Sequence, residues 1–141
     1  MTVVVDTPIW SLAFRRTPRD LKPDLEKMKW ELHELIREGR ARLLGPIRQE
    51  VLSGIREEAQ FRRLREDLRA FEDEGLTTED YEKAAEVGNR CRRVGVAGSP
   101  TDFLICACAS RRNWAIFTTD GIFVQYAEHV PFRLHAARPT P

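Results

Sequence analysis

The sequence predicts a three-layer α/β/α domain in which helices cover both faces of a small central parallel sheet. Short apolar runs of the kind that form fully buried strands stand at residues 2–5 and 114–118. Longer segments with helical spacing of apolar residues separate these runs, and such alternation favours parallel strands joined by helical crossovers. The chain has 141 residues, of which 42% are hydrophobic, enough for one domain with one core.

The first strand is expected at residues 2–5, where β-branched side chains follow one another without interruption. Thr7-Pro8 should end it, because proline has no backbone N–H to offer a strand. Residues 9–14 then form a short apolar patch with helical spacing, and we expect a further interruption at Pro18.

The next segment, residues 24–38, places its apolar side chains at helical intervals and predicts an amphipathic helix. Gly39 is a suitable residue to end this helix, because glycine readily adopts the left-handed conformation. A short strand is expected at residues 42–44, closed by Gly45 and Pro46.

A further helix is expected to begin at Pro46, since proline is favoured in the first helical turn. This helix carries Glu50, and Ser53-Gly54 is a candidate break. Residues 57–74 repeat apolar positions at helical spacing and predict another helix, which includes an acidic end and which Gly75 terminates.

Two helices are expected in the second half of the chain. Thr78 is a candidate N-cap for a helix over residues 79–93, without the acidic partner of a full capping box. After a loop, Ser99 and Pro100 form a typical helix start. The helix that follows is apolar nearly all round, so we expect it to be buried.

The remaining elements are short. A strand at residues 114–118, a helix at residues 121–128 and a last strand at residues 132–134 complete the prediction. We expect a single domain over residues 1–136 and a frayed tail over residues 137–141.

Bulk composition excludes some classes of protein. The net charge of +1 gives no indication of a polyanionic partner, although arginines crowd residues 56–69 and 90–93. Such runs are more often solvated helix faces than nucleic-acid surfaces. The three cysteines form no C-x-x-C pair and fit buried thiols better than a disulfide framework. No signal peptide or membrane-spanning segment is predicted, so we expect a cytoplasmic protein.

Four acidic residues stand beside the predicted strands and helices, namely Asp6, Glu50, Asp102 and Asp120. Aspartate is disfavoured inside strands, and a carboxylate buried alone is unfavourable. Clustered carboxylates also repel one another unless a cation joins them. The pattern therefore suggests a site for a hard divalent cation.

The spacing of Asp102 and Asp120 supports their convergence. A helix of about ten residues that begins at Asp102 rises roughly 15 Å, and the strand before Asp120 returns by about 18–20 Å. Both residues then lie at the carboxyl edge of the sheet, where ligands of α/β domains bind. Asp6 ends its strand at the same edge, and Glu50 can reach it from the helix after the second strand.

An all-carboxylate site favours Mg²⁺ or Mn²⁺ over zinc, because the histidines and cysteines share no ligand spacing. Phosphodiester hydrolysis is the chemistry best suited to such a site. Each acid also has a simpler interpretation. Asp102 fits a first-turn acid that complements the helix dipole, Asp120 fits a turn, and Glu50 fits a solvated helix face. Spacing alone leaves both interpretations open.

Four short motifs in the correct order resemble the PIN domain, and within it the VapC-type toxins of toxin–antitoxin pairs. The motifs are Val-Asp6-Thr7, Gln-Glu50-Val-Leu-Ser-Gly54, Thr-Asp102-Phe-Leu-Ile-Cys-Ala and Phe-Thr118-Thr-Asp120-Gly-Ile-Phe123. The resemblance covers nearly the whole chain and implies a PIN-like fold with the four acids as a quartet that binds Mg²⁺ or Mn²⁺. It also implies that Thr7 and Thr118 support the quartet through hydrogen bonds. One departure is Pro8, where many relatives carry a small hydroxyl residue.

The same resemblance implies a metal-dependent endoribonuclease that acts on RNA of the tRNA or rRNA class. It further implies a cognate antitoxin, with a groove between residues 10–14 and the helix at 24–38 as its candidate site, and a homodimer. Arginines from the two basic stretches, Arg62, Arg65, Arg92 and Arg93, are the candidates to hold the RNA backbone. The alternative is a catalytically silent PIN-fold module that binds RNA or protein. Receiver-type and haloacid-dehalogenase-type domains fit less well, because Thr7-Pro8 replaces the second acid that they require near the first strand.

Overall fold

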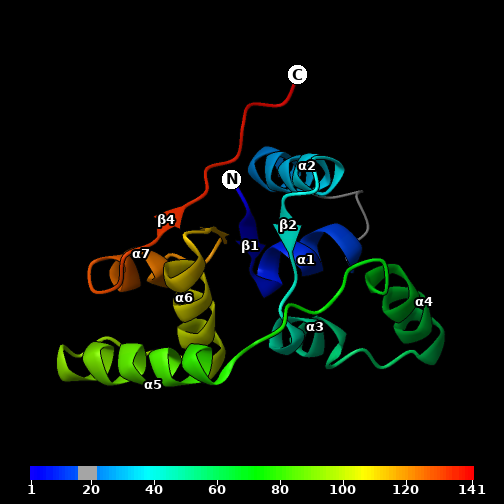
Figure 1. Cartoon of the computed structure of the whole chain (residues 1–141). Coiled ribbons are helices and arrows are strands. Elements are labelled where there is room, and N and C mark those ends of the chain that lie inside the picture. The colour runs from blue at the N-terminus through cyan, green and yellow to red at the C-terminus, as the bar shows by residue number, and fades with distance from the viewer. Residues whose placement is uncertain (16–21) are drawn as a thin grey trace.

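The computed structural model describes residues 1–15 and 22–141, and its centre is a four-stranded, entirely parallel sheet (Figure 1). The strands lie in the order β2-β1-β3-β4. Their bounds are Val3–Val5 for β1, Ala41–Arg42 for β2, Ala115–Phe117 for β3 and Arg133–Leu134 for β4. Three strands lie within their predicted ranges and are shorter than expected, whereas β2 begins one residue before the predicted range 42–44 and shares only Arg42 with it. The α/β fold class is confirmed.

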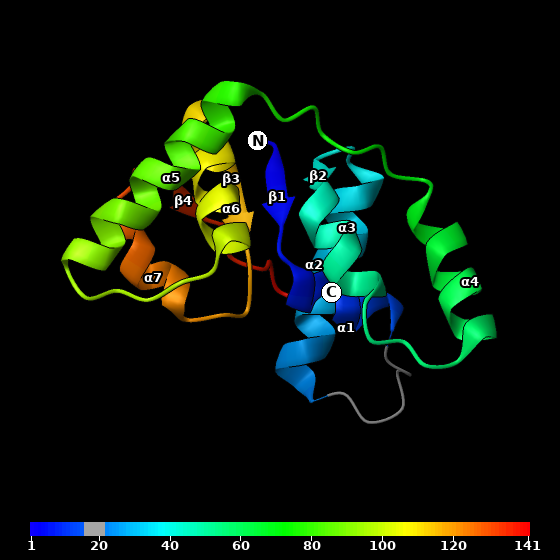
Figure 2. The ribbon, with the colours of Figure 1, turned by 90° about the horizontal axis from the view of Figure 1, so that it is seen from below.

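The connections place helices around this sheet. The chain moves outward from β1 to β2, then returns past β1 to β3. Because parallel crossovers are right-handed, movements in opposite directions place the connecting helices on opposite faces. Figures 1 and 2 show α1, α2 and α3 gathered beside β2, and α5, α6 and α7 beside β4.

The first two helices are α1 (Thr7–Phe14) and α2 (Pro23–Arg37). The carboxylate of Asp6 caps α1 by accepting from the Thr7 N–H, so the break predicted at Thr7-Pro8 is in fact a helix start. Pro8 stands in the first turn, where its missing N–H is not needed. Gly39 follows α2 with a φ of 68° and confirms the predicted stop. The interruption predicted at Pro18 lies outside the described residues.

The middle of the chain forms α3 (Gly45–Leu52) and α4 (Glu58–Leu68). The break predicted at Ser53 is confirmed, but the helix predicted to reach residue 74 ends at Leu68. The Arg48 guanidinium bonds the carbonyls of Leu68 and Phe71. Asp73 then pairs with Leu43 as an isolated parallel bridge. These two interactions turn the acidic segment away from helical geometry.

Two long helices, α5 (Thr78–Arg93) and α6 (Pro100–Arg112), pack against each other. The prediction of Thr78 as the cap of α5 is wrong by one residue. Thr77 is the N-cap, and with Asp80 it forms a complete capping box. Ser99 caps α6 as predicted, and Asn113 ends it in the left-handed conformation with a φ of 55°.

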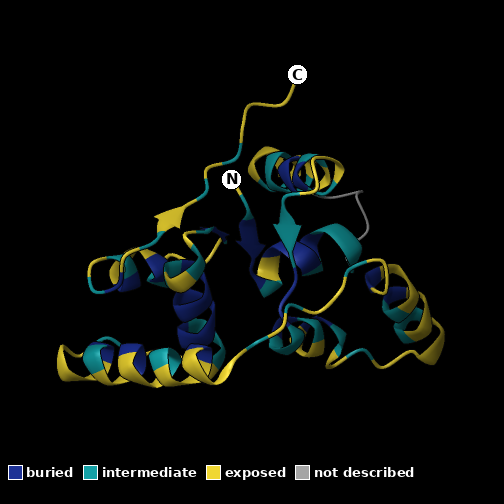
Figure 3. Cartoon of the chain, viewed as in Figure 1, coloured by how far each residue is buried: buried dark blue, intermediate teal, exposed yellow. Residues whose placement is uncertain are grey.

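The core surrounds the sheet and includes buried residues of α1 to α6, and Figure 3 shows α6 as the most continuously buried helix. Cys91, Cys106 and Cys108 are free and buried, which confirms the prediction of buried thiols. Burial raises the pKa of the Cys108 thiol to about 11, so this thiol is uncharged near neutral pH.

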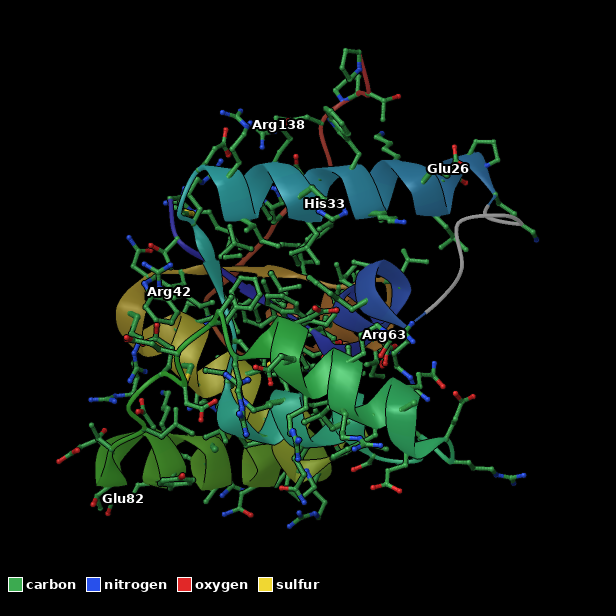
Figure 4. The ribbon with its side chains drawn as sticks, turned by 90° about the vertical axis from the view of Figure 1, so that its right-hand side faces the viewer. Glu26, His33, Arg42, Arg63, Glu82 and Arg138 are labelled. Atoms are coloured by element: carbon green, nitrogen blue, oxygen red, sulfur yellow. The ribbon has the colours of Figure 1, made fainter. Side chains whose placement is uncertain are left out.

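The short helix α7 (Ile122–Ala127) leads to β4 and the C-terminal segment. Arg138 lies beside α2 (Figure 4), where its Nε donates to Glu31 at 2.8 Å and its Nη1 donates to Glu38 at 2.9 Å. The segment predicted to be frayed is therefore anchored at Arg138. No helix in residues 1–15 and 22–141 is long and apolar enough to cross a membrane.

Candidate metal centre

Asp6 stands where β1 passes into α1, and the fold holds both of its carboxylate oxygens. The Thr7 N–H donates to Oδ1 at 2.8 Å, and the Thr118 hydroxyl donates to Oδ2 at 2.7 Å. Only 5% of Asp6 is exposed. Its position follows from topology, because a residue that directly follows a central parallel strand lies at the carboxyl edge of the sheet.

Glu50 reaches the same edge from α3, the helix that follows β2. The hydroxyl of Thr7 donates to Glu50 Oε2 at 2.7 Å. Thr7 therefore bonds both acids, Asp6 through its N–H and Glu50 through its side chain. The structure thus brings these two predicted site residues together on either side of one threonine.

A second threonine joins Asp6 to Asp120. Thr118 follows β3, and its Oγ1 accepts from the Asp120 N–H at 3.0 Å while donating to Asp6. The carboxylate of Asp120 accepts from the Ile122 N–H at 3.1 Å, which fixes the turn into α7. The two threonines that the sequence predicted as supporting residues therefore contact three of the four predicted acids.

Asp102 lies in the first turn of α6, where the Ser99 cap fixes the backbone. Its Oδ2 accepts from the Tyr126 hydroxyl at 2.8 Å. Sequence reasoning missed Tyr126, because nothing in the pattern of α7 distinguishes a tyrosine that bonds an acid from an ordinary core aromatic.

The acids also influence one another electrostatically. The pKa of the Asp6 carboxyl is raised to about 6, chiefly by burial and in part by the nearby carboxylates of Asp102 and Glu50, against the lowering effect of the bonds from Thr118 and Thr7. Within the part of the chain that the structure describes, no Lys, Arg or His forms an ion pair with any of the four acids. The described residues therefore place these acidic side chains along one edge of the sheet and supply no ion-pair partner for them.

The donor set fits a hard cation in kind. All four predicted ligands offer carboxylate oxygens, which Mg²⁺ and Mn²⁺ prefer, and each is steadied by at least one hydrogen bond. Among the described residues, however, no three acidic, histidine or cysteine side chains are already close enough to hold a metal ion. The acids surround one edge of the sheet, and side-chain rotation must complete any metal sphere.

Two of the acids at residues 72–74 pair with arginines outside this site. Asp73 pairs with Arg48 at 2.8 Å, and Glu74 pairs with Arg42 at 3.1 Å.

The four candidate RNA-binding arginines fall into two separate groups. Arg62 and Arg65 lie on α4, whereas Arg92 and Arg93 lie in the last turn of α5, and these helices stand on opposite sides of the sheet (Figures 1 and 2). Arg92 also lines a cavity of about 480 Å³ that extends to Pro100 and Thr101, directly before Asp102. Arg92 is therefore the candidate whose cavity reaches the first turn of α6, next to Asp102.

The structure thus combines a parallel sheet with acids at its carboxyl edge that threonines bond, the arrangement of a ligand-binding α/β domain. The PIN domain family model matches residues 3–129, a range that contains all four acids. The chain belongs to the PIN domain family. No curated protein sequence matches it significantly.

Solved structures repeat the fold at low sequence identity. FitAcB from Neisseria gonorrhoeae is 18% identical with a TM-score of 0.71, covering 94% of this chain and 97% of that one. VapBC2 from Rickettsia felis, bound to a DNA fragment from its promoter, is 14% identical with a TM-score of 0.68, covering 96% and 98%. VapBC-5, a toxin–antitoxin system member from Mycobacterium tuberculosis, is 16% identical with a TM-score of 0.65, covering 95% and 98%.

Proposed function

We propose that this PIN domain is a metal-dependent endoribonuclease and the toxin of a VapBC-type toxin–antitoxin pair. The observation that carries the proposal is the acidic edge, where the two threonines connect Asp6, Glu50 and Asp120, and Asp102 acts electrostatically on Asp6. Carboxylates kept together without a protein cation are suited to an external one. Membership of the PIN family and the likeness to toxin–antitoxin complexes support the same conclusion.

Asp6, Glu50, Asp102 and Asp120 would hold Mg²⁺, or Mn²⁺ in its place. When bound, such a cation activates water and stabilises the leaving oxygen of a phosphodiester. Hydrolysis adds water across one phosphorus–oxygen bond of RNA, and the 3′-oxygen leaves. The chain's contribution is to keep Asp6 in place through Thr7 and Thr118, because a carboxylate with both oxygens bonded cannot rotate away.

The RNA backbone would be held by arginines, and Arg92 and Arg93 are the better placed pair. The cavity beside Arg92 reaches the first turn of α6, whereas α4 stands on the far side of the sheet. Guanidinium groups bind phosphate through paired hydrogen bonds, which suits a substrate whose backbone must lie along the acidic edge.

An antitoxin partner is proposed from the structural neighbours, which are toxin–antitoxin complexes. An arginine of the antitoxin that enters the acidic edge would pair with its carboxylates and so inhibit the toxin. The groove proposed between α1 and α2 would have to form on their outer surface, because Ile9, Trp10 and Leu12 are buried in the core. A homodimer and a cytoplasmic location remain proposals that accompany the toxin assignment.

The test is cleavage of total cellular RNA by the purified chain with MgCl₂, followed by sequencing of the new RNA ends. We expect cleavage that EDTA abolishes and that Asp102→Asn removes without unfolding the domain. Asp67→Asn is the matched control, since Asp67 is an exposed acid of α4, and it should cleave normally. Undiminished metal-dependent cleavage by Asp102→Asn would sink the assignment. RNA binding without cleavage by the unmodified chain would favour the silent binding module instead.

A further inference from the structure

We propose that Tyr126 is a positioning residue for the candidate metal centre, which acts by fixing the carboxylate of Asp102. This inference rests on the proposed function and adds to the four acids a residue from α7. The Tyr126 hydroxyl donates to Asp102 Oδ2 at 2.8 Å, and among the described residues nothing bonds Oδ1. One oxygen of Asp102 is thus held by the protein, and the other is left for a ligand.

Asp102 needs such a partner more than the other acids do. Asp6 is held by two donors, Glu50 by Thr7, and Asp120 by the backbone of the turn in which it stands. Asp102 is half-buried in the first turn of α6, and its backbone cap does not restrain its side chain. The tyrosine hydroxyl is the contact that orients this carboxylate.

The ring of Tyr126 is itself held rigidly. The residue is completely buried, and its ring packs edge to face on Phe103 at 5.7 Å and on Phe123 at 5.0 Å between centroids. Edge-to-face pairs of this kind stabilise one ring orientation. Because Phe103 directly follows Asp102, the same cluster fixes both the donor and the turn that carries the acceptor.

The loop before α6 is shaped around this hydroxyl. A Cβ at Gly98 would overlap the Tyr126 hydroxyl and would come within 2.7 Å of the Phe103 ring. Glycine at this position therefore allows the backbone to approach the hydroxyl closely. The carbonyl oxygen of Ala97 also lies 3.3 Å from the Tyr126 hydroxyl. The carboxylate of Asp102 is closer and charged, and is therefore the stronger acceptor.

Hydrogen bonds that orient a metal ligand typically change metal affinity 10–100-fold when they are removed. We therefore expect Tyr126→Phe to bind Mn²⁺ about tenfold more weakly, because the variant keeps the ring packing and loses only the hydroxyl. A purely structural hydroxyl would change the unfolding midpoint and leave Mn²⁺ affinity alone.

The experiment is titration of Mn²⁺ into the full chain, with free Mn²⁺ measured by electron paramagnetic resonance and folding checked by circular dichroism. Tyr81→Phe is the matched control, since Tyr81 is the chain's other tyrosine and is 55% exposed. Gly98→Ala is a second variant that displaces the hydroxyl without removing it, and it should also weaken Mn²⁺ binding.

The outcomes separate the two proposals. Weaker Mn²⁺ binding by Tyr126→Phe and Gly98→Ala, with Tyr81→Phe unchanged, supports the positioning role. Unchanged affinity in Tyr126→Phe beside a clear loss in Asp102→Asn overturns the positioning role and leaves the metal centre intact. Absence of Mn²⁺ binding by the unmodified chain overturns both.

Discussion

Asp6 and Asp80 are both buried aspartates at the start of a helix, yet the fold treats them in opposite ways. Arg112 and Arg111 bond the carboxylate of Asp80, and these contacts hold its pKa well below the usual range. Asp6 receives only neutral donors, and burial raises its pKa to about 6. The fold supplies the counter-charge of Asp80, whereas none of the described residues forms an ion pair with Asp6.

The difference indicates what each acid is for. Asp80 completes the capping box of α5 and ties it to the end of α6, so its charge is used within the fold. A buried carboxylate without an ion-pair partner is unfavourable for stability, and under the proposed function a bound cation would offset this cost. The two sites should therefore respond to substitution in opposite ways.

The largest effect is expected from Asp6→Asn on cleavage. Asparagine can still cap α1 and bond Thr118, so the fold should persist, but it cannot carry the charge that a cation requires. We expect cleavage to fall by about 10³-fold or more, a loss of about 4 kcal/mol in transition-state stabilisation. Single-turnover cleavage under saturating Mg²⁺ measures it, and a variant that retains cleavage would contradict the proposed function.

The second largest effect is expected on the free energy of unfolding, from substitution of Asp80. Removing one member of a buried, hydrogen-bonded ion pair leaves its partners uncompensated. Because Arg111 and Arg112 are partly exposed, the loss should lie below that of a fully buried pair, and we expect Asp80→Asn to lower the free energy of unfolding by about 2–3 kcal/mol. Urea unfolding measures it. The folded fraction should cleave RNA normally, so a loss of cleavage in folded Asp80→Asn would break the contrast with Asp6.

The capping network around Asp80 shows why part of the fold escaped sequence reasoning. The pattern at residues 77–80 contains two threonines in succession, and spacing does not reveal which one caps. The structure selects Thr77, because only from there does Asp80 return a bond to the cap N–H at 2.8 Å while facing Arg112. The early end of α4 has the same kind of cause, since Arg48 lies 20 residues before the carbonyl of Leu68 that it bonds. Long-range side-chain bonds of this type leave no periodic signal.

The acidic edge was more predictable, because strand ends and helix starts in an α/β fold converge by topology alone. To predict that Asp6, Asp102 and Asp120 lie at one edge of the sheet, only the positions of the strands and helices were needed. Tyr126 could not be found in that way, since its link to Asp102 spans 24 residues and depends on how α7 packs against α6.

The two classes of buried acid should also be separable by pH. Asp6 has a folded pKa of about 6 against an ordinary value of 3.8, so the folded state holds its proton more tightly than the unfolded state. The tighter proton binding by Asp6 therefore stabilises the folded state fully below about pH 4, and this stabilisation is lost as pH rises through 6. At 1.36 kcal/mol per unit, this loss is about 2–3 kcal/mol at most.

The pKa values of Glu38, Glu79 and Asp80 are lowered instead, so the test compares the metal-free chain with Asp6→Asn. The variant should gain stability relative to the unmodified chain as pH rises from 4 to 7, by about 2 kcal/mol. Denaturant unfolding at several pH values in EDTA measures the difference. A difference that stays constant with pH would show that Asp6 is not held in an unfavourable charged state.

The smallest effect concerns a third buried acid, Glu31, which resembles Asp80 because the chain supplies its counter-charges. His135 lies 2.6 Å from its Oε2, and Arg138 reaches both Glu31 and Glu38 from the C-terminal segment. Arg138→Ala should lower the free energy of unfolding by about 1 kcal/mol, since Arg138 is 45% exposed and His135 remains beside Glu31.

Arg133→Ala is the matched control, because Arg133 is an exposed arginine of β4. Urea unfolding should separate the two variants, while Mn²⁺ affinity should equal that of the unmodified chain in both. Altered Mn²⁺ affinity in Arg138→Ala would mean that the contacts of the C-terminal segment influence metal binding at the acidic edge. The division between acids neutralised by the fold and acids left for a ligand would then no longer hold.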